Sequence, residues 1–373
     1  MNQLNNNTWY EVDSIQNFIS PALLVYPERI EKNIQKMITI AGGAKNLRPH
    51  IKTHKIAEIV NLQIKYGIQK YKCATIAEAE LLALCRAEDI LLAMQPVGIN
   101  IHRFFELIQK YPKSNFSTIV DNKTTVDAIC TIGVSKNIKV SVWLDLNNGM
   151  NRTGIKPNDD AKNLYQFISN NENLKIKGLH VYDGHIHDSN FDVRQKVCDQ
   201  DFEPVIEMKN SLEQLGFKVD TIIAGGTPTF PIHCKRKNVE TSPGTCLLWD
   251  EGYGKNYKDL DFLPAAILIT RVISKPKPNY LCLDLGHKSV ASEMLLPRVK
   301  LLNMKESRQI SQSEEHLVIE SKEAEKYAMG DICYAIPYHI CPTVAKYKNV
   351  LTVIDRKITG SWAVAARDNK INI

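Results

Sequence analysis

The sequence lacks the features that mark membrane and secreted proteins. No apolar run approaches the roughly 18 residues that a membrane-spanning helix requires. Residues 1–7 are polar and contain no apolar core of a secretory signal, so we expect a cytoplasmic protein without a membrane partner. Low-complexity segments and strong internal repeats are absent as well.

Regular cysteine spacing and a strong charge excess are also missing. The nine cysteines are scattered in a chain large enough to fold without disulfides, which predicts reduced thiols. The 47 basic and 41 acidic residues give a net charge of only +6. The densest basic cluster, Lys235-Arg236-Lys237, has no interleaved aromatic residue, so a solvated surface fits it better than a nucleic-acid-binding patch.

What the chain does contain is enough length and apolar content for a barrel and a smaller domain. It has 373 residues, of which 44% are hydrophobic and 24% charged. Short β-rich runs alternate with helical patterns, which predicts parallel βαβ units that close into a (β/α)8 TIM barrel. The eight expected strands lie near residues 22–26, 46–51, 70–75, 89–95, 116–121, 138–146, 174–182 and 219–224.

The pattern changes near Phe262, where helical periodicity gives way to apolar runs joined by short polar turns. This indicates a mainly antiparallel β domain. We therefore expect a barrel over residues 21–262 and a β domain over 263–373. Residues 1–20 are candidates for packing with the second domain.

The segment Arg48-Pro49-His50-Ile51-Lys52-Thr53-His54-Lys55 ends the second expected strand, where catalytic side chains of barrels gather. A lysine there can form a Schiff base if its amine is desolvated or lies near other cations. We expect His50, His54 and Lys55 to be such neighbours of Lys52. The alternative is a basic helix N-terminus at the surface, although cations are disfavoured there.

A strand of buried type, residues 222–224, opens into Gly225-Gly226-Thr227-Pro228-Thr229. Backbone N–H groups with nearby hydroxyls suit a phosphate, and late strands of barrels commonly carry such sites. An ordinary turn is the alternative. Gly244 and Thr245 would complete the cradle if they lie beside the first turn.

Two further strand ends concentrate polar side chains. Tyr182-Asp183-Gly184-His185-Ile186-His187 could bind a metal, orient a cofactor or form a solvated loop. Arg152, in the segment after the strand at 138–146, could hold an anion or face a cofactor ring, or it could form a structural salt bridge.

In the second domain, His339 and Cys341 are separated by one residue, and both suit zinc. In an extended segment both would point to one face. Two ligands are too few for a closed structural site and fit an open catalytic ion.

Together these segments resemble the D-threonine aldolase / D-serine dehydratase family, whose members join an alanine-racemase-like PLP barrel to a metal-carrying β domain. The resemblance covers nearly the whole chain from Ser20 onward. It implies that Lys52 forms the Schiff base and that Tyr182 contacts the cofactor. It also implies a phosphate cradle at Gly225, Gly226, Thr227, Gly244 and Thr245, and a metal pair at His339 and Cys341.

The resemblance further implies the reaction and its participants. We expect a PLP- and metal-dependent lyase acting on a D-β-hydroxy amino acid, with zinc as the metal, manganese or magnesium as alternatives, and a homodimeric assembly. The His–Cys pair resembles that of the dehydratases, whereas the aldolases carry a His–Asp pair. The alternatives are an amino-acid racemase, a non-catalytic PLP-binding protein, and a barrel without a cofactor.

Overall fold

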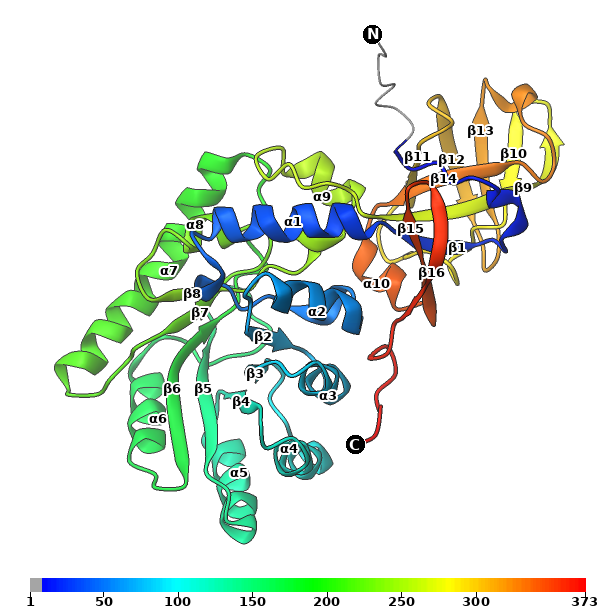
Figure 1. Cartoon of the computed structure of the whole chain (residues 1–373). Helices are drawn as coiled ribbons and strands as arrows, with labels where there is room; N and C mark the ends of the chain where they lie inside the picture. The colour runs from blue at the N-terminus through cyan, green and yellow to red at the C-terminus, as the bar shows by residue number, and fades with distance from the viewer. Residues whose placement is uncertain (1–8) are drawn as a thin grey trace. The chain divides into compact units, whose positions relative to one another are not determined.

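The computed structural model describes residues 9–373, which divide into two compact units. One unit comprises residues 34–244 and 365–373 and contains a parallel sheet with its helices (Figure 1). The other comprises residues 9–33 and 245–364 and is rich in antiparallel strands. The expected domain boundary at residue 262 stays a prediction.

The sheet of the first unit is parallel throughout, and a short extra segment closes it. Residues 47–50 join its two edges, since Leu47 forms a parallel bridge with Thr241 and His50 forms one with Lys72. This segment acts as the eighth strand, and the predicted (β/α)8 barrel is confirmed. In order across the sheet the other strands are β2 (Lys70–Cys73), β3 (Asp89–Leu92), β4 (Asn115–Val120), β5 (Val140–Leu146), β6 (Leu174–Val181), β7 (Ile222–Ala224) and β8 (Val239–Thr241).

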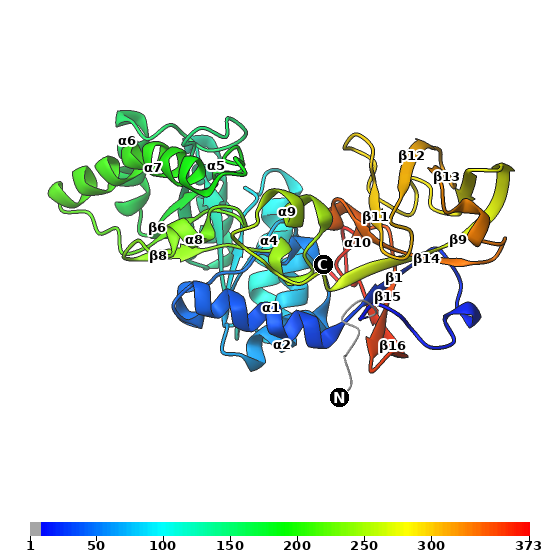
Figure 2. The ribbon, with the colours of Figure 1, turned by 90° about the horizontal axis from the view of Figure 1, so that it is seen from above.

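Helices follow the strands and flank the sheet, as Figure 1 shows for α3 to α7 and Figure 2 for α4 to α7. Ile56, Ile59 and Val60, at and within α2, form an apolar face that is fully buried. The helices up to residue 256 are α1 (Pro27–Ile40), α2 (Ala57–Lys65), α3 (Ile76–Leu84), α4 (Ile99–Lys110), α5 (Lys123–Lys136), α6 (Asp159–Ser169), α7 (Phe191–Gln214), α8 (Phe230–His233) and α9 (Glu251–Asn256).

The set of eight barrel strands differs from the expected one at both ends. The first expected strand is β1 (Ala22–Val25), and it joins the sheet of the other unit, where it pairs with β9 and β15. The last barrel strand, β8, was not predicted. It has only three residues, too few for a recognisable apolar period.

The interior of the barrel is layered. Leu91, Ile119, Trp143 and Ile223 form a buried apolar cluster contributed by β3, β4, β5 and β7. Nearer the C-terminal ends of β2, β5 and β6, the buried side chains are polar: Lys72, Asp145 and His180. Active sites of barrels form at that end, so this polar layer underlies the candidate site.

The second unit is built on a nine-stranded, mainly antiparallel sheet that includes β1, which confirms the predicted β-rich character of this part. Tyr10, Val12 and Ile15 share a buried cluster with Ile267 and Ile269. The expectation for residues 1–8 lies outside the described residues. The remaining elements are β9 (Ala266–Lys277), β10 (Tyr280–Leu283), β11 (Val299–Leu301), β12 (Ser307–Gln312), β13 (Leu317–Ser321), β14 (Ile332–Pro337), α10 (Ile340–Val344), β15 (Asn349–Ile354) and β16 (Lys357–Ala363).

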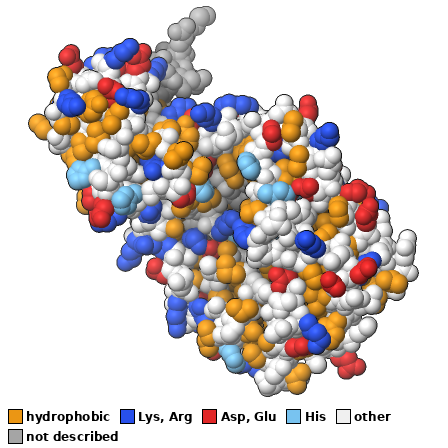
Figure 3. All heavy atoms as spheres, turned by 180° about the vertical axis from the view of Figure 1, so that it is seen from behind, with side chains coloured by type: hydrophobic (Ala, Val, Ile, Leu, Met, Phe, Trp, Pro, Cys, Tyr) orange, Lys and Arg blue, Asp and Glu red, His pale blue; other side chains and the backbone are white. Residues whose placement is uncertain are grey.

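Surface and helix composition agree with the patterns in the sequence. Acidic and basic side chains both occur over the face that Figure 3 shows. None of the helices within residues 9–373 combines the length and the apolar content that crossing a bilayer requires.

One buried ion-pair network holds the closing segment of the barrel. The Arg48 guanidinium donates to Asp89 at 2.6 Å and to Glu240 at 2.8 Å, so it links the start of β3 to β8. Arg48 is 1% exposed, whereas the side chains of Asp89 and Glu240 are 21% and 12% exposed. Removing the cation would leave two largely buried carboxylates without their main partner.

We therefore expect Arg48→Met to lower the free energy of unfolding by about 3 kcal/mol, because breaking one side of a buried ion pair leaves unpaired charge. The midpoint of urea unfolding, followed by circular dichroism, measures this. Arg356→Met is the matched control, since Arg356 forms exposed pairs with Glu11 and Asp13 and its loss should leave the midpoint nearly unchanged. Equal effects of the two substitutions would contradict the role given to Arg48.

Candidate active site

The closing segment of the barrel leads directly to Lys52. Residues Ile51–Thr53 form a 3-10 helix, and the Lys52 backbone N–H donates to Nδ1 of His50 at 3.2 Å. The Lys52 side chain is exposed. It forms no ion pair within residues 9–373.

Three cations surround the ring of Tyr182, which follows β6. The Lys52 ammonium lies 5.5 Å from the ring centroid, the Lys72 ammonium 5.4 Å, and the Arg152 guanidinium carbon 4.9 Å. The structure thus brings together Lys52, Arg152 and Tyr182, which the sequence suggested from separate motifs. A structural salt bridge of Arg152 does not occur within the described residues.

The expected cationic neighbours of Lys52 are different from those in the structure. Burial, followed by the charge of Lys52, holds the pKa of His50 well below its ordinary value. Burial also lowers the pKa of His54 to about 3, so both imidazoles are neutral at pH 7. Lys55 forms an ion pair with the buried Glu78. The cations near Lys52 are instead Lys72 and Arg152.

Lys72 was missed in the sequence because nothing near it in the chain marks it as a site residue. It is 3% exposed, and burial together with the nearby charge of Lys52 lowers its pKa to about 7. Its position in a predicted strand, two residues from the partly exposed Lys70, was the only available signal.

The two glycine turns lie side by side, which was the condition for a joint cradle. The backbone N–H of Gly244 donates to Oγ1 of Thr227 at 3.1 Å. Gly225 has a φ of +77°, a backbone conformation that residues other than glycine rarely adopt. A Cβ at Gly244 would lie 2.7 Å from the carbonyl oxygen of His50, so the backbone of this turn runs against the Lys52 segment.

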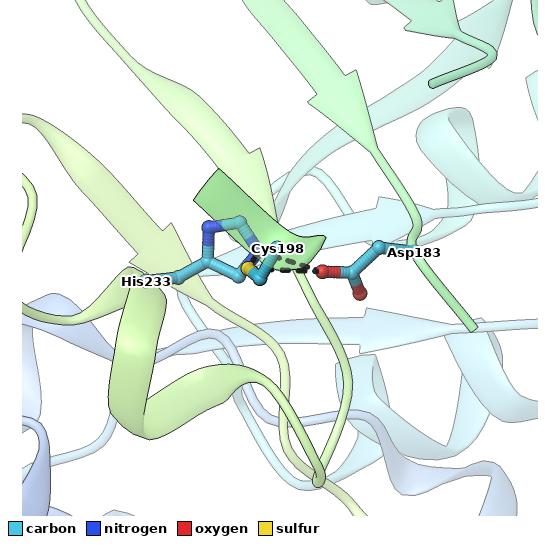
Figure 4. A group of neighbouring side chains, drawn as sticks. All are labelled: Asp183, Cys198 and His233. Atoms are coloured by element: carbon cyan, nitrogen blue, oxygen red, sulfur yellow. Dashed lines mark hydrogen bonds and ion pairs between the residues drawn. The ribbon is translucent and has the colours of Figure 1, made fainter. Parts of the chain in front are cut away.

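Asp183, next to Tyr182, anchors the loop after β6 (Figure 4). Its carboxylate accepts hydrogen bonds from Thr229 at 2.9 Å and from Nε2 of His233 at 2.7 Å. Burial would raise the pKa of Asp183, but its interaction with His233, followed by the hydrogen bond from Thr229, outweighs burial and the pKa is lowered. The loop that carries Tyr182 is therefore fixed to the start of α8.

Cys198 completes a buried group with Asp183 and His233 whose donor atoms lie close enough for a metal ion. Its sulfur is 3.4 Å from Nε2 of His233. The other ring nitrogen, Nδ1, lies 2.5 Å from a guanidinium nitrogen of Arg236, which can only donate. Nε2 of the neutral ring must then carry the proton and cannot bind a metal. Burial raises the pKa of Cys198 to about 12, so its thiol is protonated.

The histidines at positions 185 and 187 turn to separate partners. His185 contacts Asp201 of α7 through Nε2 at 2.8 Å, and Nδ1 of His187 lies 2.6 Å from the carbonyl oxygen of His185. They do not form a metal pair in this arrangement.

In the other unit, His339 and Cys341 lie at the start of a helix and not in the extended segment that we expected. His339 is the N-cap of α10, and Cys341 is in its first turn. Burial lowers the pKa of His339, but its hydrogen bonds with Cys341 and Glu293 and the charge of Asp250 raise it to about 9.

Asp250 positions this pair from within the same unit. It is 1% exposed and accepts hydrogen bonds from the backbone N–H groups of Ile340 and Tyr253, both at 2.9 Å. Burial raises the pKa of Asp250 to about 6. The hydroxyl of Thr245 lies 3.4 Å from the sulfur of Cys341. His339 and Cys341 thus supply an imidazole and a thiol, ligand types that suit zinc, whereas the three donors that converge within the described residues are those of Asp183, Cys198 and His233.

Comparison with known protein families decides where this chain belongs. Residues 25–251 match the family model "Alanine racemase, N-terminal domain". Residues 265–353 match the "Putative serine dehydratase domain". The chain belongs to the D-threonine aldolase / D-serine dehydratase family.

Named relatives in this family cover nearly the whole chain. A D-threonine aldolase of Arthrobacter sp is 25% identical over 361 residues, covering 95% of this chain and 94% of the relative. A D-serine dehydratase of Dictyostelium discoideum is 25% identical over 373 residues, covering 90% and 94%. The solved D-threonine aldolase of Filomicrobium marinum has a TM-score of 0.87 at 23% identity, covering 95% and 96%. Aldolases and dehydratases are lyases, which confirms the predicted enzyme class.

The residues present fit the PLP of this family. PLP needs a lysine, a group against its ring and a cradle for its phosphate. Lys52 and Arg152 are cations without a carboxylate partner in the described chain. The Ser242 hydroxyl, just before the second glycine turn, is buried without a hydrogen-bond partner, as is Nε2 of His180. Such atoms are suited to receive polar groups of a ligand.

The direction of the hydrogen bonds at His233 predicts which of two candidate sites binds a metal: the buried group with Cys198 or the pair His339 and Cys341. We expect Cys198→Ala to leave the metal content per chain unchanged, because Arg236 forces the metal-binding nitrogen of His233 to carry a proton. His339→Ala should remove the bound metal. Elemental analysis of both purified variants measures this, and loss of metal from Cys198→Ala would show that the buried cluster is the site.

Proposed function

We propose that this chain is a PLP- and metal-dependent lyase acting on D-configured β-hydroxy amino acids. The observation that carries the proposal is the meeting of Lys52 and Arg152 at the ring of Tyr182, 5.5 and 4.9 Å from its centroid. These residues come from three separate segments, each after a different barrel strand. The aldolase and dehydratase relatives support the same reaction class.

The cofactor-binding roles follow from this arrangement. Lys52 would hold PLP covalently, with Tyr182 and Arg152 against its ring. The glycine turns at Gly225, Gly226 and Thr227 and at Gly244 and Thr245 would bind its phosphate through backbone N–H groups and hydroxyls. The unpartnered hydroxyl of Ser242 adds a donor beside the second turn.

The metal-binding roles fall on His339 and Cys341. The thiolate and imidazole leave coordination positions open for water and a substrate oxygen, which is the arrangement of a catalytic ion. Glu293, bonded to Nδ1 of His339, would orient that imidazole. Zinc fits this soft donor set better than manganese or magnesium.

The chemistry divides between the bound groups and the chain. When bound, PLP withdraws electrons from the substrate Cα, and a divalent metal polarises an oxygen atom as a Lewis acid. For dehydration, Nζ of Lys52 would remove the Cα proton and the β-hydroxyl would leave as water, after which hydrolysis of the dehydrated amino acid gives a keto acid and ammonia. For aldol cleavage, the proton of the β-hydroxyl would be removed instead, and the Cα–Cβ bond would break to give glycine and an aldehyde.

We propose dehydration as the main reaction because Cys341 stands where the characterised aldolases of the resemblance carry aspartate. Aldol cleavage is the second candidate, supported by the D-threonine aldolase relative. A homodimer in the cytoplasm and the domain division at residue 262 belong to the same proposal.

Product analysis of the PLP- and zinc-loaded protein with D-threonine tests the reaction. We expect 2-oxobutyrate and ammonia, detected by mass spectrometry and an ammonia assay, and a bound-cofactor band at roughly 410–430 nm. Lys52→Ala should abolish both the band and the products, since no amine would hold the cofactor. If glycine and acetaldehyde are formed instead, the reaction is aldol cleavage and the proposed dehydration is wrong.

The role of Cys341 separates a lyase from a racemase. A racemase needs no metal, so Cys341→Ala would leave interconversion of D- and L-amino acids intact, whereas we expect it to abolish lyase products. A protein that shows the band but neither reaction would be a non-catalytic PLP-binding protein. Absence of the band from the loaded wild-type protein would contradict the whole proposal.

A further inference from the structure

A second lysine lies beneath the candidate active site. In β2, Tyr71 points outward, where its hydroxyl donates to the carbonyl of Ile68 at 3.0 Å, and Lys72 points into the barrel. Lys72 is 3% exposed, and its ammonium has no hydrogen bond or ion pair within residues 9–373. A buried ammonium without a counter-charge is unfavourable, so its retention calls for a partner.

The two acidic groups near Lys72 differ in their hydrogen bonding. Both oxygens of Asp183 are bonded, to Thr229 and His233, whereas Asp145 contacts Nδ1 of His180 at 2.6 Å through Oδ1 and its buried Oδ2 has no hydrogen-bond partner in the described chain. The charged and titratable groups around Lys72 come from five segments: His50 and Lys52, Asp145, Arg152, His180, and Tyr182 with Asp183.

The charge balance of this group favours an added anion. Lys52, Lys72 and Arg152 surround one ring, and no ion pair neutralises any of them within the described residues. Burial, then the charge of Lys52, lowers the pKa of Lys72 to about 7, while Asp145 and Asp183 only partly oppose this. An anion at the Lys72 ammonium would restore its charged form.

The chemistry of PLP narrows which anion this is. Its phosphate has the glycine turns as a cradle. Its phenolic oxygen is attached to the ring carbon beside the one that bears the lysine linkage, so it stays near Nζ of Lys52. Lys72 and Lys52 lie at similar distances from the Tyr182 ring centroid, 5.4 and 5.5 Å.

We propose that Lys72 is a cofactor-binding residue whose buried ammonium binds the phenolic oxygen of the PLP held on Lys52. This inference rests on the proposed function. It assigns to β2 a residue that holds the oxygen as an anion and orients the cofactor ring. It also accounts for a lysine in the barrel interior that has no ion-pair or hydrogen-bond partner for its ammonium within residues 9–373.

The test compares Lys72→Met and Lys72→Gln with Lys70→Met. Lys70 is the matched control because it is on the same strand and face but is paired with Glu240 at the surface. Absorbance of the PLP-loaded proteins is titrated with pH, and PLP affinity is measured by fluorescence. A cation beside an anionic oxygen favours the cofactor form with one proton fewer, so its loss should raise the spectral pKa by about one unit or more.

We expect both Lys72 variants to bind PLP about tenfold more weakly, as one lost charge contact predicts, and Lys70→Met to match the wild type. Without PLP, the melting temperature of the Lys72 variants should stay equal or rise, because an unpaired buried charge is removed. A structural role of Lys72 would instead lower it. Lys72→Arg, which keeps the charge, should retain the wild-type spectral pKa.

The outcomes separate this inference from the proposed function. If the wild-type protein forms no cofactor band, the proposed function fails. If the band forms but its pKa and PLP affinity are unchanged in both Lys72 variants, Lys72 does not bind the cofactor. A rise in KM for the amino acid alone would assign Lys72 to the substrate carboxylate and overturn the proposal.

Discussion

The ion pairs of Arg48 are the constraint on which the site depends. The closing segment of the barrel is only residues 47–50, and it is joined to its neighbours by single bridges and not by a continuous ladder. Arg48 links this segment to Asp89 and Glu240 from a fully buried position. Lys52 follows at once in the chain, and His50 bridges to Lys72, so both lysines take their positions from this closure.

Burial and pairing then determine which groups around Tyr182 carry an uncompensated charge. Burial makes His50 and His54 neutral, and Asp145 and Asp183 pair with His180 and His233. Lys52, Lys72 and Arg152 form no ion pair with a carboxylate of the described residues. The strand ends of the barrel are thus prepared for a ligand that carries several negative charges, which agrees with a phosphorylated cofactor and a carboxylate substrate.

The sequence could predict those parts that depend on local pattern. The alternation of strands and helices, the position of Lys52 after a strand and the glycine turns each have a short-range signal. The pairing partners of a strand have no such short-range signal. The sequence of Ala22–Val25 therefore resembles that of a barrel strand, although this strand pairs in the other sheet. The site of Lys72 likewise depends on residues from β5, β6 and the closing segment. Protonation of His50 and His54 depends on burial, which spacing alone does not encode. The start of α10 depends on Asp250, which caps it from 90 residues away.

The division of the chain into segments has a consequence for its assembly. Strand β1 pairs with β9 and β15, and these are synthesised more than 200 residues later. Residues 365–373 belong with the barrel unit, where Glu80 accepts hydrogen bonds from the backbone N–H groups of Asn372 and Ile373. The two units therefore need residues up to 364 and up to 373, respectively, before each is complete. The apolar strand β1 stays without its neighbours until β9 has been synthesised, so slow folding with high contact order follows from this architecture.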